Sequence, residues 1–358
     1  MTRFILRRLL LTIPVLFGLI LLVFILSRIV THDPCRAILG EKATDLICAD
    51  FNRRMGFDQP IPVQFGIYVG QLAQGDLGTS TKFSRPVTEV LIERLPTTVE
   101  LTVWALLFAI IVGIPLGMLS AIKRNSPVDV GAMVVANIGV SMPVFVLGLF
   151  LQFIFGVLLK NSPFSLPPSG RLSAGIDVKP LVDVWGMNDL TGIPRGILDF
   201  LSGIYTFSAA VTGQWGAWGD AARHLILPAI ALGTIPLAII ARITRSSLLE
   251  VLGQDYVRTA RAKGVRERTV IIRHATRNAL LPVVTVIGLQ LGLLFAGAVL
   301  TESTFNLAGV GRTLYEAIIG RDFAVIQGFI LIVAVAYVVV NLIVDVSYGY
   351  LDPRIRLR

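Results

Sequence analysis

The charged residues of the chain fall into clusters that are separated by long uncharged runs. Six runs each have at least 17 residues without Asp, Glu, Lys or Arg, and about 20 helical residues cross a hydrocarbon core of ~30 Å. Strands of a membrane barrel would be about 10 residues long and would alternate in polarity. The pattern therefore predicts an all-α integral membrane protein with about six transmembrane helices. The runs are Leu9–Ser27, Leu101–Ile122, Val130–Leu159, Leu225–Ala241, Ala279–Thr301 and Phe323–Val344.

The composition agrees with a membrane protein. Hydrophobic residues make up 54% of the 358 positions and charged residues only 15%, whereas soluble domains carry about 25% charged residues. The first run follows Arg3, Arg7 and Arg8 and so has the start of a secretion signal. It exceeds the 7–15 apolar residues of such a signal and lacks a small-residue cleavage site, which predicts a permanent anchor.

The basic residues are unevenly divided between the two sides of the membrane. If the N-terminus is cytoplasmic and each run crosses once, the inner segments carry a net charge of +12 and the outer segments −3. Nine of the inner basic residues lie between Arg242 and Arg277. Cytoplasmic loops are enriched in Lys and Arg, so this orientation is predicted, with both termini in the cytoplasm. The overall charge of +9 then needs no nucleic-acid partner.

The first outer segment, Thr31–Thr98, contains both cysteines of the chain, Cys35 and Cys48. In an oxidising compartment two such cysteines can form a disulfide that closes a small loop; two free thiols are the alternative. The histidines have no metal-ligand spacing relative to these cysteines, so no metal site is predicted.

Two further outer features are predicted from prolines and tryptophans. Pro86 and Pro96 bracket a short helix, Val87–Leu95. The second outer segment, Lys160–His224, contains a semi-apolar stretch, Gly196–Trp218. A seventh crossing there would move the basic loop outside, so we interpret the stretch as an interfacial or re-entrant element.

Polar residues and a proline interrupt the third run. Asn137, Ser141 and Gln152 are costly in lipid and favour the interior of a helix bundle. Pro143 removes a helical hydrogen bond, which is tolerated where neighbours or a water-lined cavity satisfy the freed carbonyl. These four residues are candidates for lining a pathway; an ordinary packing kink is the alternative interpretation of the proline.

The inner loop between the fourth and fifth runs carries the strongest motif. It reads Tyr-Val-Arg-Thr-Ala-Arg-Ala-Lys-Gly and ends at Gly264, then continues through a basic stretch to Leu281-Pro282. Two short helices that meet at the glycine would form a compact basic surface, since glycine permits a sharp turn. Small side chains at Ala260 and Ala262 would let a partner approach closely.

At these residues the chain resembles the membrane subunits of bacterial binding-protein-dependent ABC importers. Their signature is Glu-Ala-Ala, three residues and Gly, followed by Leu-Pro, and it corresponds here to Arg258-Thr259-Ala260 with Gly264. Arg and Thr replace the first Glu and Ala, as in the dipeptide and oligopeptide permease branch. Other strings of that branch occur in order along the chain, among them Gly75-Asp76-Leu77-Gly78-Thr79-Ser80, Ser141-Met142-Pro143, Gly309-Val310-Gly311-Arg312 and Leu351-Asp352-Pro353-Arg354.

The resemblance implies a type I ABC importer permease in the bacterial inner membrane, forming half of a pathway for di- or oligopeptides. Import of nickel complexes, glutathione or sugars by the same fold remains an alternative. An ion-gradient transporter would be expected to carry charges at mid-span, and the six runs contain none. The implied domains are residues 1–98, an anchor with its outer excursion, and 99–358, a core with a coupling loop at 246–277 and an outer insertion at 160–224.

The resemblance also implies the partners. These are a homologous second permease, two cytoplasmic ATPase subunits or domains, and an extracytoplasmic solute-binding protein. The ATPases would dock on Arg258, Thr259, Ala260, Arg261, Ala262, Lys263 and Gly264. The chain contains no Gly-x-x-x-x-Gly-Lys-Ser/Thr loop for ATP and no nucleophile–base constellation, so we expect neither a cofactor nor catalysis by this chain.

Overall fold

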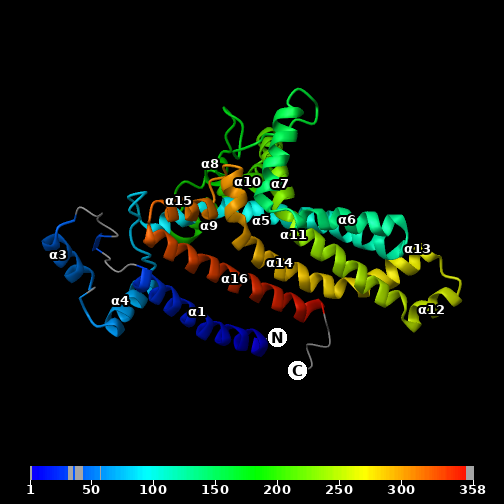
Figure 1. Ribbon diagram of the computed structural model, residues 1–358, viewed down its shortest axis with the longest axis horizontal. Helices are drawn as coiled ribbons and strands as arrows, with labels where there is room; N and C mark the ends of the chain where they lie inside the picture. The colour runs from blue at the N-terminus through cyan, green and yellow to red at the C-terminus, as the bar shows by residue number, and fades with distance from the viewer. Residues whose placement is uncertain (1, 31–34, 37–42, 57, 352–358) are drawn as a thin grey trace.

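The computed structural model describes residues 2–30, 35–36, 43–56 and 58–351. Within these residues the protein is helical and has no β-sheet (Figure 1). The helices that form the bundle are α1 (Thr2–Val30), α5 (Val87–Ile122), α6 (Pro127–Ser141), α11 (Trp215–Leu252), α14 (Thr276–Thr304) and α16 (Phe323–Leu351). The bundle also includes α7 (Val144–Leu151), which continues into the π-helix η1 (Gln152–Leu158).

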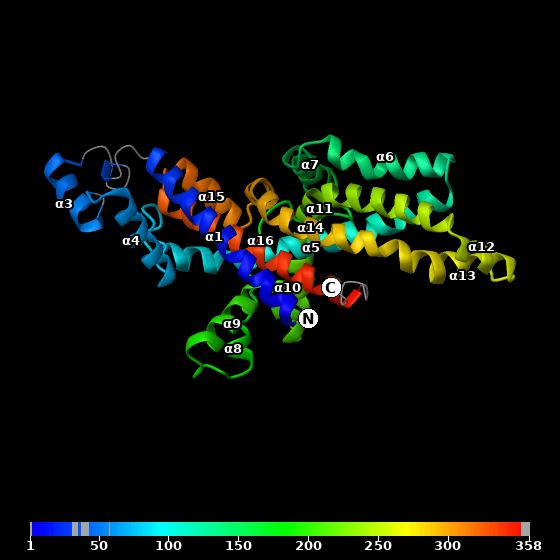
Figure 2. The same cartoon turned by 90° about the horizontal axis from the view of Figure 1, so that it is seen from below.

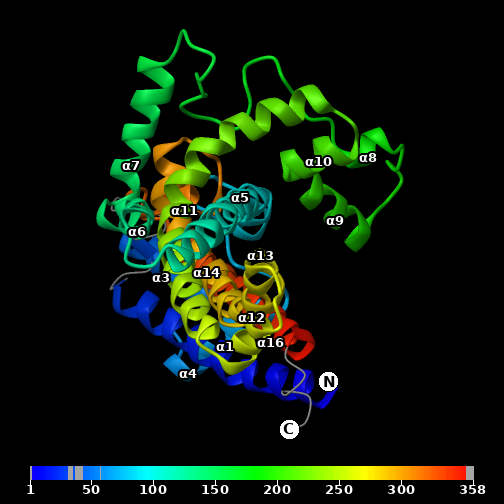
Figure 3. The same ribbon diagram turned by 90° about the vertical axis from the view of Figure 1, so that its right-hand side faces the viewer.

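Shorter helices connect the long ones at both ends of the molecule. The first outer segment holds α3 and α4. The second holds α8, α9 and α10, which lie together on one side of the bundle (Figure 3). Helices α12 and α13 lie at the opposite end of the long axis from α3 and α4 (Figures 1 and 2). The bounds are α3 (Asp45–Met55), α4 (Ile61–Ala73), α8 (Leu181–Val184), α9 (Gly192–Gly203), α10 (Tyr205–Val211), α12 (Asp255–Ala262), α13 (Glu267–Thr269), η2 (Val270–Ala275) and α15 (Val310–Ile319).

The six uncharged runs all fall on helices. By length and apolar composition, α5, α11, α14 and α16 can each cross a membrane, and α6 with α7 and η1 makes a fifth crossing if the bent pair is one span. The apolar stretch within α1, Leu10–Ile25, is shorter. The prediction of an all-α membrane protein is confirmed.

The third run is interrupted at Pro143, where the sequence predicted a kink, but the change of direction is larger than an ordinary packing kink. Helix α6 and the α7–η1 segment meet at an angle of 105°. Met142 is extended, with φ −113° and ψ 133°, because the ring of the following Pro143 disfavours a helical conformation at the residue before it. The proline therefore breaks the span instead of bending it gently.

The predicted short helix Val87–Leu95 is also wrong, because Pro96 does not end it. Helix α5 continues through Pro96 to Ile122. A Cβ atom on Gly203 of α9 would lie 2.7 Å from the proline ring, so this glycine lets α9 pack directly against it. The last ten residues of the predicted insertion at 160–224 form the start of α11, which begins at Trp215.

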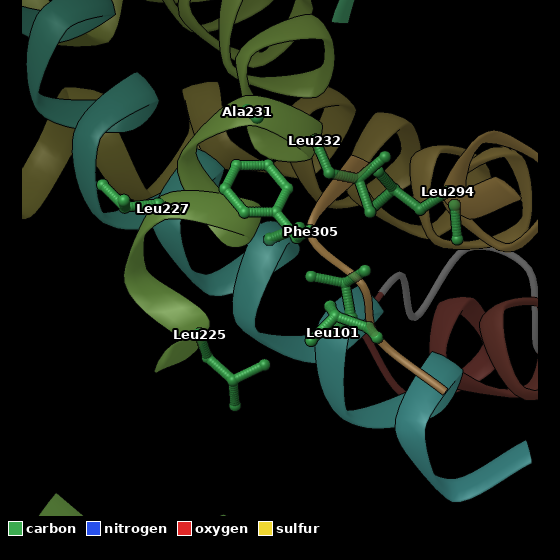
Figure 4. Packing of buried hydrophobic residues seen from close by; sticks show 10 residues of the cluster. Leu101, Leu225, Leu227, Ala231, Leu232, Leu294 and Phe305 are labelled. Atoms are coloured by element: carbon green, nitrogen blue, oxygen red, sulfur yellow. The ribbon is translucent and has the colours of Figure 1, made fainter. Parts of the chain in front are cut away.

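The bundle is built around α5, α11 and α14. A buried cluster at their outer ends includes Leu101, Leu225, Leu227, Ala231, Leu232, Leu294 and Phe305 (Figure 4). Glycines allow α5 and α11 to approach closely: a Cβ on Gly233 would lie 2.6 Å from the Ala105 carbonyl oxygen. Small residues are typical of helix contacts in a bilayer, where association depends on close packing because lipid is as apolar as the side chains.

Candidate coupling surface and pathway elements

Helix α12 and the turn at Gly264 form a projecting loop. The φ of Gly264 is +72°, a left-handed conformation that costs an L-residue roughly 1–2 kcal/mol. No atom lies within 4 Å of the position of an added Cβ. The glycine is therefore required by the turn and not by packing inside this chain, and α13 begins three residues later at Glu267.

Most of the predicted docking residues are exposed to solvent. Six of the seven residues from Arg258 to Gly264 are exposed and Ala260 is half-buried. We call this segment, Arg258–Gly264, the coupling surface. Arg258, Arg261 and Lys263 are its three basic residues, and all three are exposed. Helix α12, which carries Arg258 and Arg261, lies at the opposite end of the molecule from α3 and α4 (Figure 1).

The coupling surface is held to the bundle by residues that the sequence did not single out. Val257 is fully buried beneath α12, and the Asn278 amide donates to the Tyr256 hydroxyl at 2.7 Å. Across the turn, Arg261 donates to both oxygens of Glu267, at 3.0 and 2.7 Å. The loop is thus held to the rest of the chain on one side and is exposed on the other.

The four pathway candidates are not gathered into one site. The Ser141 hydroxyl donates to the Asn137 carbonyl one turn back, and the Asn137 side chain accepts from Arg242 at 3.0 Å. Ser141 and Pro143 are exposed at the break between α6 and α7. Gln152 lies further along, where its amide donates to the carbonyls of Pro168 and Thr304.

An ion pair fastens the inner ends of three helices. Arg245 of α11 donates to both carboxylate oxygens of Asp129 on α6, at 2.9 and 2.8 Å, and the Ser120 hydroxyl of α5 donates to the same carboxylate. The Asp129 side chain is 7% exposed. Breaking a buried pair leaves an uncompensated charge, so this contact ties the segment that leads into the coupling surface to its neighbours.

A buried carboxylate organises the outer corner of the bundle. Glu302, at the end of α14, accepts from the Thr98 hydroxyl of α5 at 2.6 Å and from the Arg312 backbone N–H at 2.9 Å. The Thr98 oxygen accepts in turn from the Val310 N–H. Gly309 is wrapped so closely around this carboxylate that a Cβ there would overlap it. The Gly309-Val310-Gly311-Arg312 string therefore has a structural role, because its backbone encloses the Glu302 carboxylate. We call this arrangement the Glu302 clasp.

A second carboxylate attaches the first outer segment. Asp322 is fully buried and accepts from the Ser80 hydroxyl at 2.5 Å and the Lys82 N–H at 3.1 Å. Beside it, Glu316 pairs with Lys82 and Arg312. Burial alone would raise the pKa of Glu316, but the hydrogen bonds from these two cations outweigh it and hold the pKa below its ordinary value.

The second outer segment has its own anchor on α5. Glu100, 2% exposed, pairs with Arg171 at 2.6 Å and accepts from the N–H and the hydroxyl of Thr206 at 2.6 and 2.7 Å. The Arg171 guanidinium stacks on the Tyr205 ring, 3.7 Å from its centroid, a cation–π contact. Nothing in the sequence distinguished Glu100 as a buried charge, because its partners are about 70 and 106 residues away.

The two cysteines are joined in the structure. The Cys35 and Cys48 sulfurs are 2.03 Å apart and form a disulfide. Cys48 lies in α3, so the bond links this helix to Cys35. Among the residues that the structure describes, no group of three or more His, Cys, Asp or Glu could hold a metal ion.

A bundle of membrane-crossing helices with an exposed basic loop at one end and two attached segments of shorter helices defines a polytopic membrane protein. The chain belongs to the family of binding-protein-dependent transport system inner membrane components. The family's core matches residues 113–357, and its N-terminal part matches residues 1–102.

Individual relatives match the whole chain. The chain is 45% identical to the dipeptide transport system permease protein DppB of Alkalihalophilus pseudofirmus over 356 residues, which is 99% of this chain and 100% of the relative. It is 45% identical to the di/tripeptide transport system permease protein DppB of Pseudomonas aeruginosa, with 99% of each covered. It is 36% identical to the glutathione transport system permease protein GsiC of Salmonella choleraesuis, with 100% of each covered.

Proposed function

We propose that this chain is the permease subunit of an ABC importer for di- or oligopeptides and forms half of the translocation pathway. The observation that carries the proposal is the coupling surface, exposed and fastened on one side only, in a chain that matches dipeptide permeases along its full length. A binding protein delivers the peptide, and a homologous second permease supplies the other half of the pathway.

Energy for transport comes from partner ATPases. The chain has no phosphate-binding loop, so ATP hydrolysis belongs to cytoplasmic subunits that dock at Arg258–Gly264. Moving a two-state equilibrium from 1:99 to 99:1 takes about 5.5 kcal/mol of differential interaction. The ATPases must therefore bind the coupling surface differently in the inward-open and outward-open states.

Substrate class is tested on the complete importer in proteoliposomes. We expect dipeptide-loaded binding protein to stimulate ATP hydrolysis and uptake. Competition with glutathione, a nickel chelate and a sugar separates the alternatives; the similarity to a glutathione permease makes glutathione the most informative competitor. Stimulation by one of these and not by dipeptides would overturn the peptide assignment. Uptake driven by an ion gradient without ATP would overturn the class.

The break between α6 and α7 is proposed to line the pathway. Its exposed Ser141 and Pro143 lie where the helical ladder is interrupted, and interrupted helices are tolerated within a membrane only where protein or a water-lined cavity covers them. Asn137 lies one turn before the break. Gln152, which is bonded to Pro168 and Thr304, instead positions the second outer segment.

The orientation has a direct test. We propose that the coupling surface and both termini are cytoplasmic and the 160–224 segment is outside. A cysteine at exposed Arg266 should react with an impermeant thiol reagent only from the cytoplasmic side, and one at exposed Asp189 only from the outside. Labelling of both positions from the same side would reject this topology.

A further inference from the structure

Helix α4 has no charged residue and no buried side chain. Its thirteen residues, Ile61–Ala73, have Gln64 and Gln71 as their only amide side chains. The side chains of Ile61, Val63 and Ile67 are 65%, 47% and 40% exposed. Helices this short are marginal in water even for the best sequences, and a surface helix normally turns its apolar residues toward a core. Helix α4 leaves several of them uncovered.

One side of α4 packs on α1. The Phe65 ring lies edge-on to the rings of Phe17 and Phe24, with centroids 5.8 and 5.3 Å apart, and Tyr68 lies 5.7 Å from Phe24. Phe65 and Tyr68 are three residues apart and share this side, while Val63 and Ile67 are four residues apart and share the other. The two helices lie together at the outer end of α1 (Figures 1 and 2).

The contact places α4 at the depth of the bilayer. Phe17 and Phe24 both belong to the uncharged run that ends at Ser27. At 1.5 Å per residue, Phe24 is roughly 5 Å and Phe17 roughly 15 Å below that end along the α1 axis. The Phe65 ring contacts both rings and so lies roughly 10 Å below that end, among the acyl chains of the outer leaflet of a core about 30 Å thick.

The charges that flank α4 agree with this depth. Arg53, Arg54 and Asp58 precede it and Asp76 follows it, which leaves an uncharged window between Asp58 and Asp76. Helix α3 is different, because it carries two acidic and two basic residues on eleven positions. A change from charged to uncharged and back is the pattern of a segment that enters an interface and leaves it again.

We propose that α4 is an interfacial helix whose side chains at Val63 and Ile67 are inserted among the lipids of the outer leaflet. Thirteen residues are too few to cross the bilayer, so the helix lies in the interface beside α1. The occupant of its open side is lipid, because α4 packs on the uncharged run of α1 and carries no charged residue of its own. The first outer segment is thereby held to the membrane at α4, with the disulfide-closed part on the water side.

Spin labels measure the depth directly. Full-length, non-reduced protein, whose own cysteines are joined, is labelled at Val63→Cys and Ile67→Cys and placed in phosphatidylethanolamine–phosphatidylglycerol vesicles. Leu46→Cys is the matched control, because Leu46 is an 85% exposed apolar residue on the charged helix α3. We expect the ratio of collisions with oxygen to collisions with a water-soluble nickel chelate to be at least about fivefold higher at 63 and 67 than at 46.

Two results would overturn the proposal. Ratios at 63 and 67 equal to that at 46 would place α4 in water. Low collision rates with both reagents at 63 and 67 would mean that protein, such as the second permease, covers this side. If either label disturbs folding, lipid-soluble photoreactive probes on unlabelled protein supply the second measurement: cross-links to Ile61–Ala73 are expected, and their confinement to the long helices would count against lipid contact.

Discussion

Arg261 and Glu267 close the coupling turn with a two-point ion pair, and Gly264 lies midway between them. Both side chains are about half exposed, at 41% and 55%. Exposed pairs contribute about 0.2–1 kcal/mol, so the pair shapes the turn without dominating the stability of the fold.

Replacing Gly264 with valine should uncouple transport without preventing membrane insertion. The side chain would strain a left-handed position and occupy the open side of the turn. We expect ATPase co-purification to fall at least tenfold and uptake to drop to background, while the yield of protein in the membrane stays normal. Uptake and co-purification are measured on the same preparations.

The matched control for this substitution is Gly213→Val. Gly213 has the same φ of +72° and the same open surroundings, but it lies between α10 and α11 on the outer side. Gly309 is unsuitable, because a Cβ there would collide with Glu302. Equal loss of ATPase in both variants, or full uptake by Gly264→Val, would reject the assignment of the coupling surface.

Charge reversal should reveal the role of the Arg261–Glu267 pair. Arg261→Glu or Glu267→Arg alone places like charges across the turn, and we expect each to weaken ATPase binding by about 3–10-fold, partly through repulsion of roughly 1 kcal/mol. The double swap restores the pair and should recover most of that loss. A binding assay with the purified ATPase measures it. If the loss of ATPase binding free energy in the double variant equals the sum of the losses in the two single variants, these residues are not energetically coupled.

The Glu302 clasp should be a larger determinant of stability than any surface pair. Glu302→Gln keeps the shape but replaces one of the two accepting oxygens with an NH2 group, and leaving that buried donor without an acceptor costs about 1–3 kcal/mol. We expect a clear drop in melting temperature in detergent, with a smaller drop for Thr98→Val. Glu93→Gln, at a 53% exposed pair on the same helix as Thr98, is the control. Equal melting of the Glu302 and Glu93 variants would contradict the prediction.

The disulfide has a simple chemical test. Non-reduced protein should resist alkylation at Cys35 and Cys48 and gain two labels after reduction, because only free thiols react. The Cys35→Ser variant should instead accept one label in either condition. A loop of this size is expected to contribute about 3 kcal/mol through the unfolded state. Identical labelling of the unchanged protein before and after reduction would show that the bridge is absent.

The sequence was sufficient for the helices but not for their ends and bends. Uncharged runs mark helices directly, because a backbone in lipid must satisfy its own hydrogen bonds. Prolines were ambiguous: Pro143 breaks a span, whereas Pro96 sits inside α5. The difference lies in the tertiary surroundings, since Gly203, about a hundred residues away, packs on the Pro96 ring.

The buried polar contacts were likewise hidden from local patterns. Gly264 was found because a left-handed turn leaves a local signature in the chain. Glu100, Glu302 and Asp322 were not distinguishable from surface acids, because what makes them buried is the arrival of Arg171, Thr98 and Ser80 from distant segments. Periodicity and motifs describe neighbours in sequence, and these carboxylates depend on neighbours in space.

The clasp at Glu302 also sets an order of events during synthesis. Thr98 is made 204 residues before Glu302, an interval of roughly 10–40 s at 5–20 residues per second. Until the end of α14 has been synthesised, the Thr98 hydroxyl has no Glu302 carboxylate to donate to. Asp322 reaches Ser80 later still. The contacts of Thr98 and Ser80 can therefore form only after most of the chain has been synthesised.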